Sequence, residues 1–255
     1  MTRWRTCLDR LVVLIIILAA WQIGSSMAGP YWLSSPWAVA SRFTVQILNG
    51  ELIRHGGYTI EESLIGTLIG GVPAVLLPFL LRRHPVIVAI LDPFMVGGYG
   101  APKLAFAPLL ILWFGIGDLP KLVVVTLMVF YITFITTSAG IRAVDARLIN
   151  MARLAGASES VIAREIIWQS LLPFFFTGLK VALPRAVSAT IVGEFLVASE
   201  GVGHYIEHSR QVSDTVGVFA GIVIAMALVL AINAVVNVVE RRALGWRPVE
   251  RDMEI

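Results

Sequence analysis

Charged residues are scarce in this chain. Asp, Glu, Lys and Arg make up 15% of its 255 residues, whereas hydrophobic residues make up 57%, and the mean hydropathy is +0.82. An ordinary soluble domain carries about 25% charged residues, so this composition excludes that class of protein. The sequence predicts an integral membrane protein.

Cysteine and lysine are rarer still, and their scarcity excludes two kinds of chemistry. Cys7 is the single cysteine, so no intrachain disulfide can form. Lys103 and Lys121 follow proline and Lys180 follows leucine, so the phosphate-binding pattern G-x-x-x-x-G-K-[ST] is missing. We therefore expect no cofactor on this chain, and any ATP that powers it must bind to another subunit.

One motif imitates a metal site. His204-Tyr205-Ile206-Glu207-His208 matches the H-x-x-E-H pattern of zinc peptidases, which places two histidines on one face of a helix. The pentapeptide stands alone after a glycine-rich turn, and neither of the other histidines, His55 and His84, has a convincing supporting acid. We interpret the match as coincidental and predict neither a metal site nor enzymatic activity.

Long apolar runs dominate the chain. They lie at about 11–28, 63–81, 86–117, 121–140, 173–198 and 215–238. Each is near or above the roughly 20 residues that cross a bilayer as a helix. The sequence therefore predicts an all-α polytopic membrane protein with about six transmembrane helices.

The start of the chain resembles a secretory signal peptide. An arginine-rich head precedes the apolar run 11–20, and the small residues Ser26-Met27-Ala28 follow. Removal of this segment would leave five spans. We interpret it instead as the first membrane span.

Basic residues are distributed unevenly around these spans. Thirteen of the 20 Lys and Arg lie on the side that holds both chain ends and the loop 141–172. The positive-inside rule places that side in the cytoplasm. This asymmetry also accounts for the net charge of +3 without a nucleic-acid partner.

Local signals mark the segments around the second span. Ser35 and Pro36 predict the start of a short amphipathic helix on the outer surface, which ends at Asn49-Gly50. In the second span, Gly66 and Gly70 form a small-residue face against which another helix can pack closely. At the outer end of that span, we expect solvent or headgroups to receive Glu61 and Glu62.

The third span is interrupted near membrane depth by Gly97-Gly98-Tyr99-Gly100 and Pro102. Broken backbone is tolerated there only where it is buried in protein or lines a wet cavity. We therefore predict a translocation path beside this span. The alternative is a kinked helix with only a packing role.

The fifth span carries a central charge. Arg185 follows Pro184 about 18 Å into the span at 1.5 Å per residue, and Glu194 lies near the outer end. Nine residues at 100° each put these two side chains on opposite faces. Because an arginine that faces lipid costs at least about 2.5 kcal/mol, our hypothesis is that Arg185 lines the path, with a structural ion pair as the alternative. The predicted path residues are Arg185, Glu194, Pro102 and Lys103.

Residues 141–178 form the longest charged, helix-patterned segment between apolar spans. Asp145 is a suitable N-cap for a short helix, Gly156 for its end, and Ser158 with Glu159 for the start of a second helix. The pattern predicts helix, tight turn and helix, and is typical of a cytoplasmic docking loop. An ordinary connecting loop is the alternative.

Four stretches have the pattern of a known family. They are Ser35-Pro36; PKLAFAPLLILWFGIGD from Pro102 to Asp118; Gly156 with Ile166 and Leu172-Pro173; and GLKVALPRAVSATIVGEFLVASEGVGHYI from Gly178 to Ile206. They resemble the permease subunits of ATP-binding-cassette importers of the nitrate, sulfonate, taurine and bicarbonate type. Glu240-Arg241-Arg242 before Trp246 also resembles the tail of that family. The second stretch is the most specific.

The resemblance implies a coupling loop at 141–172 that docks on a cytoplasmic ATPase and transmits its closure to the spans. The docking residues are expected to be Asn150, Met151, Ala152, Gly156 and Ala157. This chain departs from the family where Asn150-Met151-Ala152 replaces Glu-Ala-Ala and Trp168-Gln169 replaces Leu-Pro. Pro184 stands where a small residue is expected, and Arg185 beside it is unusual.

The resemblance defines the expected organisation. Residues 1–57 hold the first transmembrane helix and the outer amphipathic segment, 58–245 form the permease core, and 246–255 are a cytoplasmic tail. We expect a homodimer in the bacterial inner membrane, in contact with lipid and with both termini in the cytoplasm. Two ATPase subunits and an external solute-binding protein would serve it, and the solute would be a small anion such as a sulfonate, nitrate or taurine. The alternative function is an ion-gradient-driven secondary transporter.

Overall fold

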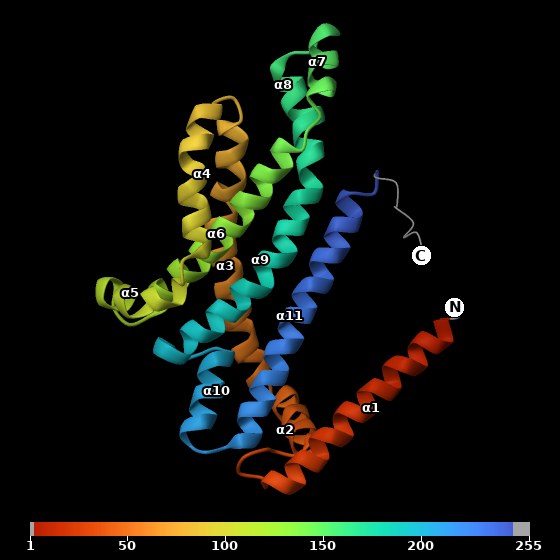
Figure 1. The fold of residues 1–255 in the computed structure, drawn as a ribbon. Coiled ribbons are helices and arrows are strands. Elements are labelled where there is room, and N and C mark those ends of the chain that lie inside the picture. Colours follow the sequence, from red (N-terminus) through yellow and green to blue (C-terminus); the bar gives the residue numbers. More distant parts are fainter. Residues whose placement is uncertain (1–2, 247–255) are drawn as a thin grey trace. The chain divides into compact units, whose positions relative to one another are not determined.

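The computed structural model describes residues 3–246, except for the side chains of residues 3–7 and Val197. Arg247, Arg251 and all but the first residue of the predicted tail 246–255 lie outside the described residues. Every regular element within residues 3–246 is a helix (Figure 1), which confirms the all-α class. Six segments qualify as membrane spans when a sharply bent pair of helices counts as one.

The chain divides into two compact units. The first contains Met1–Thr59 and Glu194–Leu228, and the second contains Ile60–Gly193 and Val229–Ile255. Three long helices contribute residues to both: α3 (Glu51–Leu81), α9 (Trp168–Val197) and α11 (Thr215–Ala243).

The first unit contains α1 (Arg3–Ala28), α2 (Pro36–Leu48) and α10 (Val202–Gln211), with parts of the long helices. The Ser35 hydroxyl accepts a hydrogen bond from the Ala38 amide at 3.2 Å, and α2 ends before Asn49. The predicted helix 36–48 is thus confirmed. The second apolar span begins earlier than hydropathy indicated, because α3 is already helical at Glu51.

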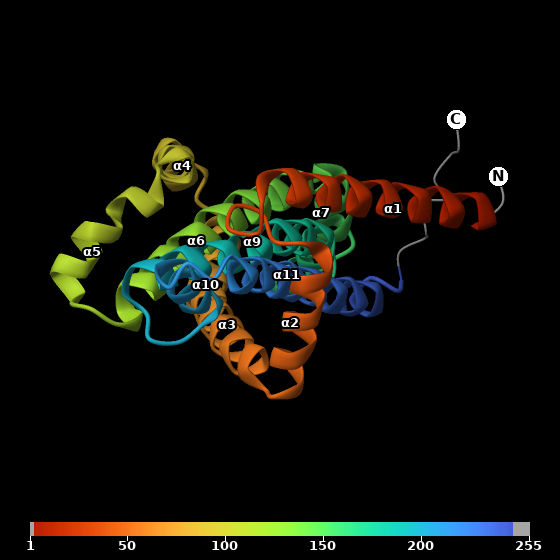
Figure 2. The same ribbon diagram turned by 90° about the horizontal axis from the view of Figure 1, so that it is seen from below.

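The second unit holds the interrupted span. Helix α4 (Pro85–Gly100) is followed by the short 3-10 helix η1 (Lys103–Phe106) and by α5 (Ala107–Phe114), and the chain bends by 80° between the two halves. Figure 2 shows α4 end-on with α5 running away from it. The predicted break is confirmed at Ala101 and Pro102, whereas residues 97–100, which were also expected to interrupt the helix, form the last turn of α4. Proline 102 lacks an amide proton, and the Ala101 amide makes the last α4 hydrogen bond, to the Gly97 carbonyl.

Helix α3 packs closely on α6 (Asp118–Arg142). A Cβ atom on Gly66 would overlap the Val125 side chain, and one on Gly70 would overlap the Thr126 carbonyl. This contact confirms the predicted small-residue face. Residues that share the adjoining core come from α5, α6 and α9: Leu110, Val124, Val125, Val129, Ile132, Ala182, Ala186 and Ala189.

Glu62 corrects one expectation. Its side chain is largely buried, and a carboxylate oxygen lies 2.6 Å from the Lys121 ammonium, which in turn lies 2.9 Å from Asp118. The sequence predicted solvent or headgroups as the partner of Glu62. A buried lysine from α6, 59 positions along the chain, takes that place.

The remaining helices of the second unit form and follow the loop after α6. They are α7 (Ala146–Leu154), α8 (Glu159–Val161) and the π-helix η2 (Ile162–Ile167), which leads into α9. Farther along, α9 and α11 pack through an apolar cluster of Phe176, Leu183, Val187, Ile232 and Val236. Lys180 of α9 forms an ion pair with Glu240 of α11.

Candidate functional site

A pocket of about 230 Å³ lies beside the break in the third span. It is lined by Tyr99, Ala101, Pro102, Lys103, Leu104, Met128, Ile132 and Arg185. Three of the four predicted path residues, Arg185, Pro102 and Lys103, therefore surround one cavity. The lining contains two cationic side chains and no acidic one.

The Lys103 side chain bonds to the backbone on both sides of the end of α4. Its ammonium donates hydrogen bonds to the Tyr99 carbonyl at 2.7 Å and to the Ala101 carbonyl at 3.3 Å. Tyr99 is the last residue but one of α4, so no following helical turn supplies an amide for its carbonyl. The ammonium also lies 5.1 Å from the centre of the Tyr131 ring, within cation–π range. This buried lysine thus satisfies the carbonyl groups that the interruption exposes.

Arg185 reaches the same pocket from α9. One terminal nitrogen of its guanidinium lies 3.4 Å from the Tyr99 hydroxyl, and the side chain is exposed. Within residues 3–246 no acidic side chain forms an ion pair with it. The guanidinium is therefore available to an anion in the pocket, which argues against the structural ion pair considered from the sequence.

Sequence reasoning did not select Tyr99, although it lies within the Gly-rich interruption. Tyr131 packs against a glycine in this stretch, because a Cβ on Gly98 would overlap the Tyr131 ring. Tyr99 places its carbonyl on Lys103 and its hydroxyl near Arg185. The only sequence signal is an aromatic residue embedded in glycines, which does not reveal either partner.

Glu194 has a different environment, in the first unit. The residue is 1% exposed, and its carboxylate accepts hydrogen bonds from the Thr59 hydroxyl at 2.7 Å and the Gly203 amide at 2.6 Å. It therefore caps the start of α10. Gly201 precedes that helix with φ +103°, and a Cβ there would overlap the carboxylate. Glu194 is not among the residues that line the pocket at Arg185.

The H-x-x-E-H pentapeptide lies on α10, in the first unit. Both Glu207 carboxylate oxygens accept hydrogen bonds from the Arg210 guanidinium, at 2.7 and 2.6 Å. These bonds lower the pKa of Glu207 to about 2. Among the described residues no group of three or more His, Cys, Asp or Glu side chains could hold a metal ion. The glutamate is thus bound to Arg210 rather than oriented toward the two histidines as a ligand or base.

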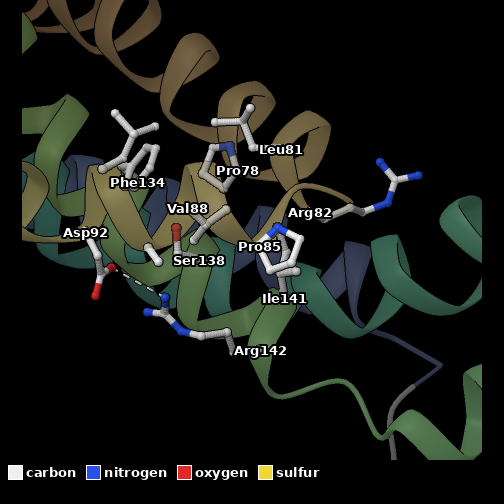
Figure 3. A pocket seen from close by; sticks show the side chains of 12 residues that line it. Pro78, Leu81, Arg82, Pro85, Val88, Asp92, Phe134, Ser138, Ile141 and Arg142 are labelled. Carbon is white, nitrogen blue, oxygen red and sulfur yellow. Dashed lines mark ion pairs between the residues drawn. The ribbon is translucent and has the colours of Figure 1, made fainter.

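A second pocket of about 350 Å³ lies where α3, α4 and α6 meet (Figure 3). Its lining is mostly apolar, with Pro78, Leu81, Val88 and Phe134 among its members. Figure 3 shows the Asp92 and Arg142 side chains facing each other at its edge, as an ion pair of 3.5 Å. The remaining charged residue of its lining is Arg82, whose guanidinium donates to the Phe79 carbonyl.

The loop 141–172 has the predicted helical architecture. The Asp145 carboxylate accepts the Arg147 amide at 2.8 Å and so caps α7, as expected. Gly156 adopts φ +81° in the turn, a conformation that L side chains rarely adopt. Ser158 occupies the next N-cap position without a capping bond, because its hydroxyl pairs with that of Ser160 at 2.9 Å. The predicted N-cap position is thus confirmed, although the Ser158 side chain makes no capping bond.

Helix α7 exposes apolar side chains. Met151 is 66% exposed and Leu154 is 90% exposed, while Leu148 is also on the surface. Asn150 and Gly156 are exposed as well, and Ala152 and Ala157 are half-buried. The short helix and its glycine turn thus present an uncovered apolar surface between charged side chains, as a docking element requires.

The fold and these two features define a multi-pass membrane protein with an interrupted span and an exposed helical loop. Residues 65–245 match the family described as the binding-protein-dependent transport system inner membrane component. The chain belongs to this family. It is a permease subunit of an ATP-binding-cassette importer in the inner membrane, and the ion-gradient transporter is not favoured.

Named relatives match nearly the whole chain. It is 32% identical to the putative aliphatic sulfonates transport permease protein SsuC of Bacillus subtilis, over 91% of this chain and 85% of that one. It is 29% identical to the formylaminopyrimidine transport permease protein ThiX of Halalkalibacterium halodurans, over 97% and 99%. An inward-facing structure of the MetNI methionine transporter matches 75% of this chain and 95% of its own, with a TM-score of 0.64 at 16% identity. That likeness shows a shared fold.

Proposed function

We propose that this permease carries a small organic anion of the sulfonate class across the inner membrane. Two copies of the chain form the path, an external binding protein delivers the solute, and ATPase subunits dock on the loop 141–172. ATP-driven closure of the ATPases moves the two loops and opens the path outward. The permease itself performs no chemistry on the solute.

The observation that carries the anionic preference is the exposed Arg185 guanidinium beside the Tyr99 hydroxyl, in a pocket with no acidic lining residue. A guanidinium binds the oxygen atoms of an oxyanion through charge-assisted hydrogen bonds, which are stronger than neutral ones. The Lys103 ammonium already bonds to two carbonyls but adds positive charge to the same cavity. In this pocket an anion would therefore bind directly to the Arg185 guanidinium, and the Lys103 ammonium would attract it without donating a hydrogen bond to it.

The relatives are named for different solutes. SsuC is named for aliphatic sulfonates and ThiX for formylaminopyrimidine. The two cations around the pocket favour the sulfonate class for this chain. A formylaminopyrimidine has no anionic group to compensate Arg185, so we propose that it is a poor solute here.

The ATPase contact is proposed for Asn150, Met151, Ala152, Gly156 and Ala157. Its support is the exposed apolar face of α7 and the left-handed turn at Gly156. The usual glutamate of this motif is replaced by Asn150, so the dock relies more on apolar burial, to which Met151 contributes. By the positive-inside rule this loop and both chain ends face the cytoplasm.

The test is uptake into proteoliposomes that contain the permease, its ATPase and its binding protein. We expect ATP-dependent uptake of ethanesulfonate, competed by other sulfonates and unaffected by formylaminopyrimidine. Uptake that proceeds without ATP and follows a proton or sodium gradient would contradict the proposed function. Competition by formylaminopyrimidine alone would contradict the proposed solute class.

A further inference from the structure

The coupling loop is attached to more than the two helices that it joins. Along the chain it connects α6 to α9. In the second unit it also contacts Phe79 at the end of α3 and Arg83, which follows that helix. These contacts are not required by chain connectivity, since they pair residues 76 or more positions apart.

The first contact is a carboxylate shared by two arginines. One Glu159 oxygen lies 2.9 Å from the Arg83 guanidinium, and the other lies 2.9 Å from the Arg153 guanidinium on α7. Glu159 therefore joins three segments: the docking helix, the start of the helix after Gly156, and the connection between α3 and α4. All three side chains are about half exposed, so salt can screen the bridge.

The second contact is aromatic. The Trp168 ring meets the Phe79 ring of α3 edge-to-face, with centroids 5.8 Å apart and an interplanar angle of 89°. The Arg82 guanidinium carbon lies 4.4 Å from the centre of the Phe79 ring, and its Nη1 donates to the Phe79 carbonyl at 2.6 Å.

The two contacts lie on either side of the π-helix η2. Glu159 precedes it and Trp168 follows it. Ile162 and Ile167 at its two ends are buried, which anchors the segment to the second unit. Two separated attachments restrain both the position and the rotation of a rigid segment relative to α3, whereas a single one would leave it free to pivot.

A pocket of about 580 Å³ lies beside the bridge. Arg83, Arg153 and Glu159 are part of its lining, together with Ile149, Ile162 and Ile167. The bridge therefore lies at the rim of a cavity. Its loss would leave the Phe79–Trp168 contact as the second attachment of the loop to α3.

We propose that the Arg83–Glu159–Arg153 bridge, supported by the Phe79–Trp168 contact, transmits displacement of the coupling loop to α3. This inference rests on the proposed docking of the ATPase at the loop. The three charged residues are positioning residues: they touch no solute, and they make α3 move with α7. Because Gly66 and Gly70 hold α3 close to α6, a displacement of α3 also reaches the core that borders the solute pocket.

The test compares two glutamate variants in the reconstituted importer. Glu159→Gln removes the charge that joins the arginines, and Glu165→Gln is the matched control. Glu165 is six positions on, exposed, and paired only with its neighbour Arg164 among the described residues. Each variant is measured for ATPase binding, ATP hydrolysis and solute uptake, so that the number of ATP molecules hydrolysed per solute is obtained.

We expect Glu159→Gln to raise that ratio about threefold while the ATPase still binds, and Glu165→Gln to leave it unchanged. Threefold is about 0.7 kcal/mol at 1.4 kcal/mol per tenfold, which is within the range of exposed ion pairs. Increasing the salt concentration from about 0.1 to about 1 M shortens the Debye length from about 10 to about 3 Å. It should raise the ratio of the wild type toward that of Glu159→Gln and have a smaller effect on the variant.

Two results separate failure of this inference from failure of the proposed function. A wild-type ratio in Glu159→Gln, with uncoupling by Gly156→Trp, would overturn the bridge and leave the docking model in place. A wild-type ratio in both Glu159→Gln and Gly156→Trp would overturn the docking model on which the bridge rests. Equal ratios in Glu159→Gln and Glu165→Gln, both above wild type, would show a nonspecific charge effect and also overturn the bridge.

Discussion

The Arg185 guanidinium lies 3.4 Å from the Tyr99 hydroxyl, although 86 positions separate the two residues. One residue comes from the helix after the coupling loop and the other from the break in the third span. Their meeting places the mid-span charge of α9 at the interruption of the third span. A charge and a break that are separate in the chain therefore belong to one pocket.

Replacement of Arg185 by Gln should weaken anion transport. Loss of one charge-assisted hydrogen bond worth about 1.5 kcal/mol corresponds to roughly a tenfold higher KM for a sulfonate. Arg185→Lys keeps the charge but lacks the planar guanidinium, so its KM should lie between those of Arg185→Gln and the wild type. Uptake kinetics in proteoliposomes check this, and normal kinetics in Arg185→Gln would remove the residue from the path.

Lys103 and Tyr99 should affect different quantities. Lys103→Met leaves the Tyr99 carbonyl without its ammonium donor, so we expect a lower thermal stability in detergent, with an unfolding cost of about 1–3 kcal/mol. Tyr99→Phe removes only the hydroxyl and keeps the carbonyl, so it should raise KM by a few-fold, less than Arg185→Gln. Equal losses of stability in both variants would contradict this division of roles.

Gly156 should resist substitution because of its backbone angle and not because of crowding. Its φ is +81°, and a Cβ atom added there would have no neighbour within 4 Å, so Gly156→Ala adds strain of roughly 1–2 kcal/mol without a clash. Gly156→Trp adds bulk in the docking surface as well, and should uncouple ATP hydrolysis from uptake. Parallel measurements of ATP hydrolysis and solute uptake in proteoliposomes check this.

Gly57→Ala is the matched control for Gly156→Ala. Gly57 has equal space around it but lies inside α3 with an ordinary backbone angle. Alanine favours a helix interior over glycine by about 0.5–1 kcal/mol, so this variant should transport normally and be slightly more stable. Loss of ATPase binding in Gly57→Ala but not in Gly156→Ala would contradict the proposed dock.

The buried pair of Glu62 and Lys121 should be sensitive to removal of one partner. Glu62→Gln leaves a buried ammonium with only Asp118 as its acidic partner, and we expect a loss of up to about 3–5 kcal/mol in unfolding free energy. Glu61→Gln, at the exposed neighbouring position, should change it by less than about 0.5 kcal/mol.

Glu62→Gln combined with Lys121→Met should recover part of that loss, because no uncompensated charge remains. Denaturant unfolding in micelles checks these three variants and the single variant Lys121→Met. If the double variant were as unstable as the sum of the two single ones, the stabilising contact would lie elsewhere.

Features that depend on neighbouring residues could be predicted from the sequence. Pro102 lacks an amide donor and Gly156 tolerates a positive φ, so the break and the turn follow from single residues. Asp145 needs only the amide two positions on to cap α7. The face of Gly66 and Gly70 follows from a spacing of four on a helix.

Partnerships between distant residues could not be predicted. Glu62 was expected in solvent because its span end is polar, yet Lys121 reaches it from another helix. Ser158 has the right residue type for a cap, yet its hydroxyl bonds to Ser160. Glu159 was expected only to begin a helix, and its two arginines come from different segments.

Hydrophobicity, and the local stiffness or freedom of proline and glycine, act within a few residues of the chain. By themselves they determined that this protein is a helical membrane protein with an interrupted third span and a helical loop before its fifth. Which charges meet depends on how the helices pack, and packing brings together residues that have no relation in the sequence. Only the tertiary structure therefore decided that Arg185 meets Tyr99, that Lys121 neutralises Glu62, and that Glu159 ties the loop to α3.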